Sequence, residues 1–188
     1  MSSFDEAFKR QVASQRSADA ATRSVEEHRR RAAEAAVPEI KKLLRDFCRT
    51  LREHGVRPAS VELPQITTYG FFGKKTKRQF SPDGYKLGSH APIGGQLDYV
   101  LLLIPDERFW SYVHNWKSKQ EPRSGYIDVT AQQLLSGLPL DIVVTDDGEI
   151  GVRSTVGHDA GDTLLSPVEE KLASMARYII DEHQKGRS

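Results

Sequence analysis

The sequence of 188 residues has a single cysteine, Cys48, which excludes a disulfide framework. Because it has no CxxC pair and no clustered cysteines and histidines, we expect no structural zinc. The best apolar run, Tyr99–Ile104, is far shorter than the roughly 20 residues of a membrane-spanning helix. The first residues are polar and acidic, unlike a secretory signal peptide. These absences predict a cytoplasmic protein that does not enter a membrane.

Known catalytic motifs are also missing. The chain has no GxSxG elbow, no GxxxxGK[ST] loop and no GxGxxG following a strand. Two clusters resemble metal or acid–base sites, but turn and loop composition explains both, and neither has the spacing of a calcium loop. They are His158, Asp159 and Asp162, and Asp146, Asp147 and Glu149. We therefore expect no metal and no cofactor and favour a protein that is not an enzyme, although a dispersed catalytic site stays open because such sites are defined by geometry.

Charge is unevenly distributed along a chain whose composition is that of a globular protein. Residues 1–90 carry 18 Lys and Arg against 11 Asp and Glu, whereas residues 91–165 carry 5 against 11. This asymmetry indicates a basic surface for an anionic partner. The alternative is that the basic and acidic halves attract each other.

Residues 3–36 predict one long helix, because they contain no Gly or Pro and are rich in good helix formers. Small apolar residues recur with a heptad rhythm, but a seam made mostly of alanine buries little area. We expect residues 1–36 to form a helical arm for self-association or docking, and residues 37–188 to form one globular domain. The candidate partner-binding residues are Ala18, Ala21, Val25, Ala32 and, from an aromatic group further along the chain, Trp116.

Pro38 is expected to break or kink this helix and to begin a second, strongly amphipathic one that ends at Gly55. Cys48 falls on the apolar face of the second helix, which predicts a core residue rather than a nucleophile. The apolar face comprises Val37, Ile40, Leu44, Phe47, Cys48 and Leu51.

The region after Pro58 predicts strands, including a hairpin between Lys77–Phe80 and Tyr85–Leu87 through a turn at Ser81–Gly84. Residues 109–116 favour a strand over a helix, with at least Phe109 or Trp110 in the core. Further expectations are a short helix over Ala131–Ser136, a hairpin around Asp146–Gly148, a loop over 154–165, and a last helix starting from a capping box at Ser166–Glu169. The fold class is therefore α+β: a long N-terminal helical arm, a second amphipathic helix, a mostly antiparallel sheet of five or six strands, and a C-terminal helix packed on the sheet.

The segment Tyr69–Arg78 is the strongest functional candidate. It places aromatics between glycines and follows them with four cations in five positions. Bases stack on aromatic rings and phosphates pair with cations, so this pattern indicates a nucleic-acid contact. The alternative is an edge hairpin whose aromatics turn inward and whose lysines maintain solubility. The candidate residues are Tyr69, Phe71, Phe72, Lys74, Lys75, Lys77 and Arg78.

These patterns favour a non-catalytic binding protein that contacts nucleic acid through a basic, aromatic hairpin. A second hypothesis is a protein-interaction module, such as an inhibitor, an antitoxin-like partner or an assembly adaptor, acting through the N-terminal helix. A third is a small enzyme with a dispersed site.

Overall fold

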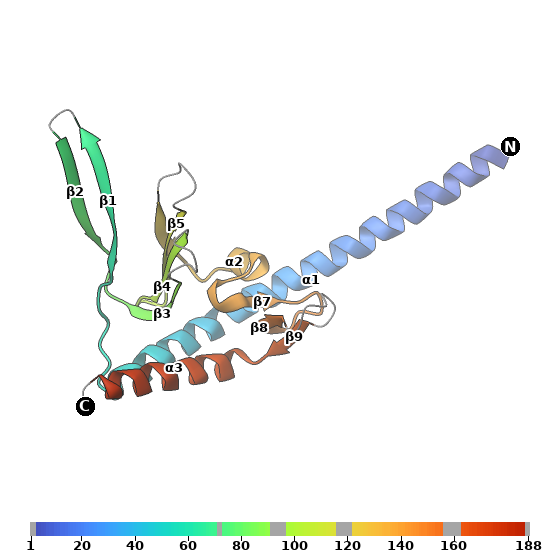
Figure 1. The fold of residues 1–188 in the computed structure, drawn as a ribbon. Helices are drawn as coiled ribbons and strands as arrows, with labels where there is room; N and C mark the ends of the chain where they lie inside the picture. The colour runs from blue at the N-terminus through green and yellow to red at the C-terminus, as the bar shows by residue number, and fades with distance from the viewer. Residues whose placement is uncertain (1–2, 71–72, 91–96, 116–121, 156–162, 187–188) are drawn as a thin grey trace. The chain divides into compact units, whose positions relative to one another are not determined.

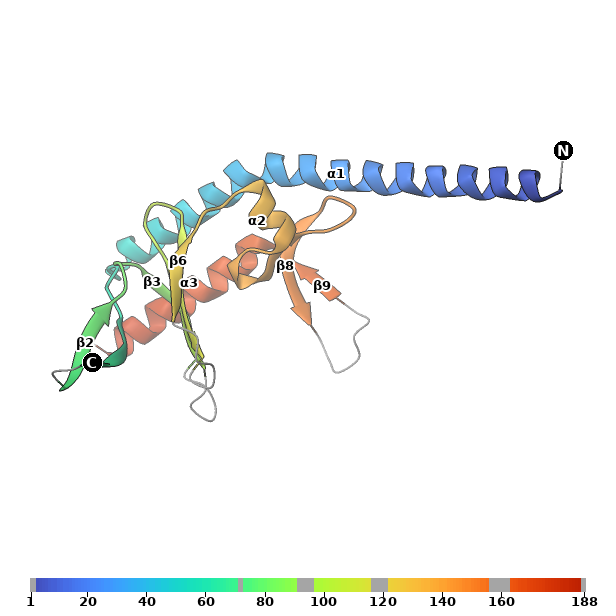
Figure 2. The same ribbon diagram turned by 90° about the horizontal axis from the view of Figure 1, so that it is seen from above.

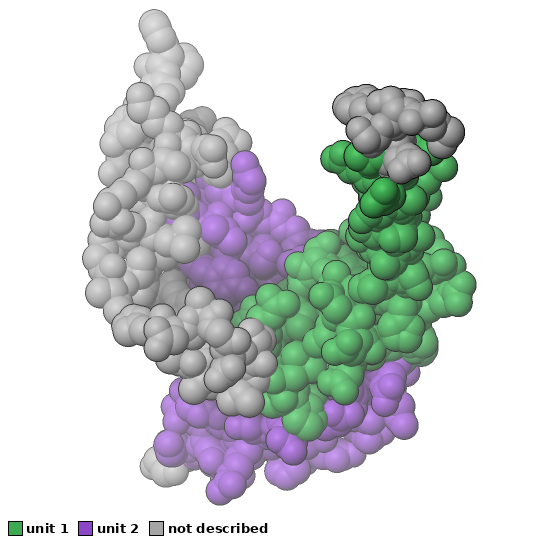
Figure 3. Space-filling view, turned by 90° about the vertical axis from the view of Figure 1, so that its right-hand side faces the viewer, with its two compact units in different colours: residues 1–38, 130–168 green, residues 39–129, 169–188 purple. Residues whose placement is uncertain are grey.

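The computed structural model describes residues 3–70, 73–90, 97–115, 122–155 and 163–186. The chain divides into two compact units (Figure 3). Unit 1 comprises Met1–Pro38 and Thr130–Val168, and unit 2 comprises Glu39–Val129 and Glu169–Ser188. The division expected from the sequence, 1–36 and 37–188, concerns independent folding and stays a prediction.

Helix α1 runs without interruption over Ser3–Glu53, so the expected break at Pro38 is wrong (Figure 1). Pro38 is exposed, while Ala36 and Ile40 on either side of it are buried. A proline inside a helix removes one backbone hydrogen bond. Here the buried face continues past the proline from Ala33 to Leu44, and its burial opposes the interruption.

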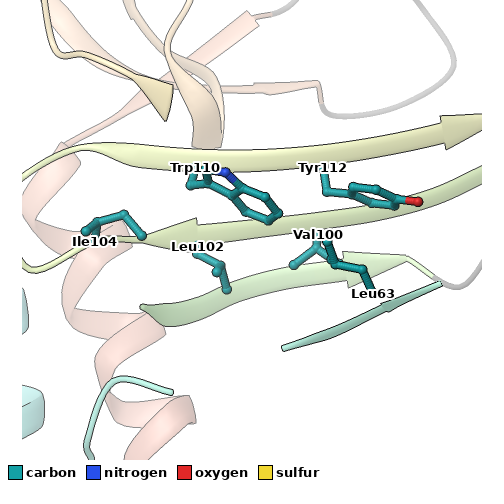
Figure 4. Packing of buried hydrophobic residues seen from close by; sticks show 6 residues of the cluster. All are labelled: Leu63, Val100, Leu102, Ile104, Trp110 and Tyr112. Carbon is teal, nitrogen blue, oxygen red and sulfur yellow. The ribbon is translucent and has the colours of Figure 1, made fainter. Parts of the chain in front are cut away.

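Unit 2 contains an antiparallel sheet in the order β3-β4-β5-β6. Its strands are β3 (Tyr85–His90), β4 (Leu97–Leu103), β5 (Phe109–Asn115) and β6 (Arg123–Ile127). The expectation of a strand over residues 109–116 is therefore confirmed for residues 109–115, and Trp116 lies outside the described residues. Buried residues on one face of this sheet form a cluster with Leu63, which comes from a separate strand (Figure 4); the others are Val100, Leu102, Ile104, Trp110 and Tyr112.

The opposite face of this sheet is tied to the last part of α1. Tyr85 pairs with Leu103, and its hydroxyl donates a hydrogen bond to the carbonyl oxygen of Cys48 at 3.4 Å. Cys48 is buried, as expected from its place on the apolar face of the helix. The C-terminal helix α3 (Val168–Lys185) buries Leu172 and Ala176 in the same unit.

A separate two-stranded sheet in unit 2 pairs β1 (Glu62–Gly70) with β2 (Gly73–Phe80). The expected hairpin between Lys77–Phe80 and Tyr85–Leu87 is wrong, because β2 pairs with β1 and β3 pairs with β4. The sequences of the strands explain this pairing. β2 reads Gly-Lys-Lys-Thr-Lys-Arg-Gln-Phe and has little to bury, whereas Tyr85 at the start of β3 is 2% exposed.

Unit 1 adds α2 (Ala131–Ser136), a 3₁₀ turn η1 (Pro139–Asp141), and a sheet in the order β7-β8-β9 (Figure 2). Its strands are β7 (Ile142–Val144), β8 (Ile150–Thr155) and β9 (Thr163–Ser166). The short helix is confirmed, since the hydroxyl of Thr130 accepts a hydrogen bond from the backbone N–H of Gln133 at 3.2 Å. The hairpin around Asp146–Gly148 is also confirmed.

Two expectations for the region before α3 are wrong. Part of the expected loop over 154–165 forms the strand β9 together with Ser166. The expected capping box is absent, because Ser166 is the last residue of β9 and α3 begins only at Val168; the hydroxyl of Ser166 donates to the carbonyl oxygen of Val152 at 3.5 Å. Ser166, which the sequence pattern assigned to the start of the helix, is instead paired within the β8–β9 sheet.

The α+β class is confirmed, and the described residues form three antiparallel sheets in place of one sheet of five or six strands. No helix in the described ranges combines the length and the apolar character needed to span a membrane.

Candidate nucleic-acid interface and exposed helical arm

The β1–β2 pair, called the ribbon below, contains most of the predicted nucleic-acid contact. Among the described strands it pairs with no other, so it is a two-stranded sheet with two free edges. Its ladder pairs Tyr69 with Lys74, Thr68 with Lys75, and Ile66 with Lys77. For these positions the structure describes the backbone course and the pairing.

The predicted residues thus occupy neighbouring positions toward one end of the ribbon. Arg78 lies on β2 opposite the irregularity between Leu63 and Ile66. Gly70 pairs with Gly73 at the last rung before the connection between the strands. Phe71 and Phe72 fall outside the described residues, as does Trp116 from the predicted partner-binding set.

The other end of the ribbon is anchored to the rest of unit 2. Leu63 is 5% exposed in the core cluster (Figure 4). The backbone N–H of Val61 donates to the hydroxyl of Ser81 at 2.8 Å, and the N–H of Ser81 donates to the carbonyl oxygen of Val61 at 3.0 Å. From Leu63 to Gly70 the strand covers about 23 Å at the usual rise of a β-strand. The ribbon therefore has a fixed base and carries its cations away from that base.

Gly84 helps to hold this base. It pairs with Ala59, and a Cβ at this position would lie 3.0 Å from side-chain atoms of both Ile104 and Leu102. Such contacts are tighter than most real Cβ contacts, so glycine at position 84 allows the chain entering β3 to approach β4 closely.

The N-terminal part of α1 is exposed around its circumference. From Ala7 to Glu27 every side chain is exposed except the half-buried Val12. Within the helical arm expected over residues 1–36, the name arm is used from here on for residues 7–25 only. Three of the predicted partner-binding residues, Ala18, Ala21 and Val25, lie on it and are exposed, with Val25 at 44%. The fourth helical residue, Ala32, is half-buried.

The turn between β7 and β8 covers α1 just beyond the arm. His28 Nε2 lies 3.2 Å from the carbonyl oxygen of Asp147, and Arg29 Nε lies 3.3 Å from a carboxylate oxygen of Asp146. Gly148 has φ +80°, and a Cβ there would lie 2.9 Å from His28 Nε2 and 3.2 Å from the Cβ of Ala32. The surface around Ala32 is therefore occupied by a turn of its own chain.

This arrangement also accounts for the acidic cluster at the turn. Asp146 pairs with Arg29, and the N–H of Glu149 donates to the hydroxyl of Thr145 at 3.1 Å, which closes the turn. Within the described ranges, no three His, Cys, Asp or Glu side chains gather as metal ligands would. The other cluster, at residues 158–162, falls outside those ranges.

Described residues of unit 2 line at least two grooves. The larger, of about 700 Å³, runs between β3 and α3 and includes Lys171, Ser174 and Glu182; Glu182 is ion-paired with Lys185 at 2.8 Å. The smaller, of about 480 Å³, lies between α1 and α3 and includes His54, whose Nδ1 lies 2.9 Å from the carbonyl oxygen of Thr50. Burial raises the pKa of the Cys48 thiol to about 12, which suits a core residue.

Sequence reasoning missed one feature of the arm. Lys9, Arg16 and Arg23 follow one another at intervals of seven residues, and all three are exposed. The seven-residue spacing was the available signal, because it places residues along one side of a helix. The apolar heptad residues Ala18, Ala21 and Val25 lie on another side of the same stretch of helix.

Comparisons with protein-family models, curated proteins and solved structures found no match to this chain.

Proposed function

We propose that the protein binds nucleic acid through the cations of the ribbon, without catalysis and in the cytoplasm. One observation carries the proposal: Lys74, Lys75, Lys77 and Arg78 lie on a strand whose only partner among the described strands is β1. A two-stranded ribbon of this kind is one of the two elements that the major groove of DNA admits. Closely spaced cations release counterions from the phosphate backbone and supply affinity for any sequence.

The position of the cations favours this function over a purely protective one. A sheet edge is commonly kept soluble by one or two lysines. Here four cations fall within five positions near the end of a ribbon whose base is buried at Leu63. Tyr69, beside Lys74 in the ladder, adds an aromatic group of the type on which exposed bases stack.

Binding to a labelled single strand of 25 nucleotides and to a duplex of 25 base pairs, titrated across salt, tests this proposal. Replacing Lys74, Lys75 and Lys77 together by alanine should weaken binding. It should also reduce the slope of log K against log salt by about 2.7 for the duplex and about 2.1 for the single strand, because each phosphate contact contributes about 0.9 or 0.7. The matched control replaces the same lysines by arginine, which keeps the charge and should keep the slope.

The proposal fails if the alanine variant, shown by circular dichroism to be folded, binds with the slope of the unchanged protein. It fails equally if the unchanged protein binds neither probe at low salt. A preference for the single strand would identify stacking as the main contribution, and a preference for the duplex would identify groove binding.

A second function, self-association through the arm, is favoured by the exposed seam of Ala18, Ala21 and Val25. Small residues allow two helices to approach closely, although the area that they bury is small. Replacing Ala18 and Ala21 by glutamate in the full chain should lower the average mass in sedimentation equilibrium. If the unchanged protein is a monomer at every concentration, self-association is ruled out.

A further inference from the structure

The arm combines exposure, length and charge in a way that its apolar seam does not explain. Its 19 residues contain four cations, Lys9, Arg10, Arg16 and Arg23, and a single acidic residue, Asp19, and the exposed Glu26 and Glu27 follow the arm directly. Lys9, Arg16 and Arg23 make no ion pair within the part of the chain that the structure describes. These cations are left to solvent.

Farther along the same helix the cations are neutralised. Arg31 lies 2.6 Å from Glu27, and Arg30 lies 3.8 Å from Glu34, each at the four-residue spacing of a helical ion pair. A helix whose charges serve only solubility is expected to carry such pairs throughout. In the arm, Asp19 lies three residues from Arg16 and four from Arg23, but within the described residues it forms no ion pair with either.

Helix geometry places the three unpaired cations on one side. Residues seven apart are separated by about two turns, so Lys9, Arg16 and Arg23 lie about 10.5 Å apart and drift by only about 20° per step. They form a row about 21 Å long, which we call the basic row. Ala13 and Ala20 lie within about 60° of the row and are too small to hold a ligand away from the helix; the acidic Asp19 also lies within about 60° of the row, between Arg16 and Arg23.

The basic row and the apolar seam occupy opposite sides of α1. Counting about 100° per residue, the mean direction of Lys9, Arg16 and Arg23 differs by about 170° from that of Ala18, Ala21 and Val25. A partner helix on the seam would therefore leave the row free. The two surfaces can be tested separately.

We infer that the basic row is a second nucleic-acid contact, in which Lys9, Arg16 and Arg23 lie against the phosphates of a double-stranded nucleic acid. This inference rests on the proposed function and assigns it a second surface. A straight, rigid row suits a duplex, which presents one negative charge per about 1.7 Å of its axis. A membrane surface is the poorer match, because an interfacial helix needs a strongly apolar face and the seam is mostly alanine.

The test compares two triple variants on a duplex of 30 base pairs across salt. Replacing Lys9, Arg16 and Arg23 by glutamine should reduce the salt slope by about 2.7, since three phosphate contacts are lost. The matched control replaces Arg31, Arg49 and Arg177 by glutamine. It removes the same net charge, but each of these arginines already has a carboxylate partner, at 2.6 Å for Arg31, 2.8 Å for Arg49 and 4.0 Å for Arg177. The control should keep the slope.

Two outcomes overturn the inference. Equal losses in both variants mean that only net charge matters, and an unchanged slope in the first variant removes the row from the interface. A third outcome also counts against it: if poly-L-glutamate displaces the duplex at equal charge concentration, the row binds acidic polymers in general.

The ribbon variant described above separates the two claims. If the ribbon variant loses affinity and the row variant does not, nucleic-acid binding stands and the second contact fails. If only the row variant loses affinity, the basic row carries the binding and the ribbon proposal fails. If neither changes the slope, both fail.

Discussion

Helix α1 differs sharply between its two ends. Toward its C-terminus it buries Leu44, Phe47 and Leu51, each 4% exposed or less, and contributes to the core of unit 2. Over the arm it exposes nearly every side chain, and most of these are alanine, serine and cations. Packing of an apolar face supplies most helical stability in proteins. The arm instead relies on the intrinsic preference of its residues and on being continuous with a packed helix.

The two ends of α1 therefore show two different sources of helix stability. The packed end is held by burial, and a substitution there changes the stability of the whole unit. The arm buries little, so substitutions in it affect local helicity and whatever the arm binds. The following predictions test this difference, from the largest expected effect to the smallest.

Replacing Leu44 by alanine should lower the free energy of unfolding by about 2–5 kcal/mol, because a fully buried leucine is removed from a packed core. Urea denaturation followed by circular dichroism measures this loss. The matched substitution in the arm is Val25→Ala, which should change stability by less than about 0.5 kcal/mol. A comparable loss for Val25→Ala would contradict the comparison and indicate that the arm is buried against a second molecule in solution.

Replacing Gly148 by alanine should cost about 1–3 kcal/mol, because the residue has φ +80° and lies against His28. The substitution tests the contact that ends the exposed part of the helix. Gly125→Ala is its control, since a Cβ at Gly125 would meet nothing within 4 Å. Thermal unfolding of both variants measures the difference, and equal melting temperatures would show that the turn is not held against α1.

Replacing Ala20 by glycine should reduce local helix stability by about 1 kcal/mol and leave the global unfolding midpoint unchanged. The far-ultraviolet circular dichroism signal and the exchange rates of the arm amides report the local effect. The same change at Ala33, which is 0% exposed, should shift the global midpoint. If Ala20→Gly moves the midpoint as far as Ala33→Gly, the arm is not an independent part of the helix.

The smallest effect concerns the turn between β4 and β5. In this turn Glu107 lies 2.7 Å from Arg45, which is in the packed part of α1. The hydrogen bond from Arg108 holds the pKa of Asp106 below its usual value. A carboxyl with a lowered folded-state pKa stabilises the protein above its unfolded pKa, and this contribution is lost as pH falls through the folded value. Asp106→Asn should therefore melt slightly lower than the unchanged protein at neutral pH, and the two melting temperatures should converge as the pH falls through the lowered pKa of Asp106.

The companion substitution Arg108→Gln separates the ion pair from its surroundings. Arg108 also lies over the ring of Tyr126, 4.4 Å from its centroid. Removing it should lower the melting temperature at both ends of the pH range, with a larger drop at neutral pH. A pH-independent drop would show that the ring contact alone stabilises the turn.

Much of the local structure could be predicted from the residues. The apolar spacing around Leu44 and Cys48 predicted a buried helical face, and Asp147-Gly148 predicted a hairpin. The candidate residues of the ribbon were recognised from their order alone, and their function stays a proposal. The pairing of β2 was not predicted, because Ser81–Gly84 has the residues of a turn while Gly84 in fact pairs with Ala59.

Composition and periodicity by themselves determined the α+β class, the helical arm and the concentration of cations between Tyr69 and Arg78, because these depend on residues close together in the chain. Tertiary structure alone decided three other features. It carried α1 through Pro38, paired the polar β2 with β1, and turned Ser166 from a helix cap into a strand residue. The physical reason is the same in each case: burial and strand pairing act between distant residues and together outweigh a local preference of about 1–3 kcal/mol.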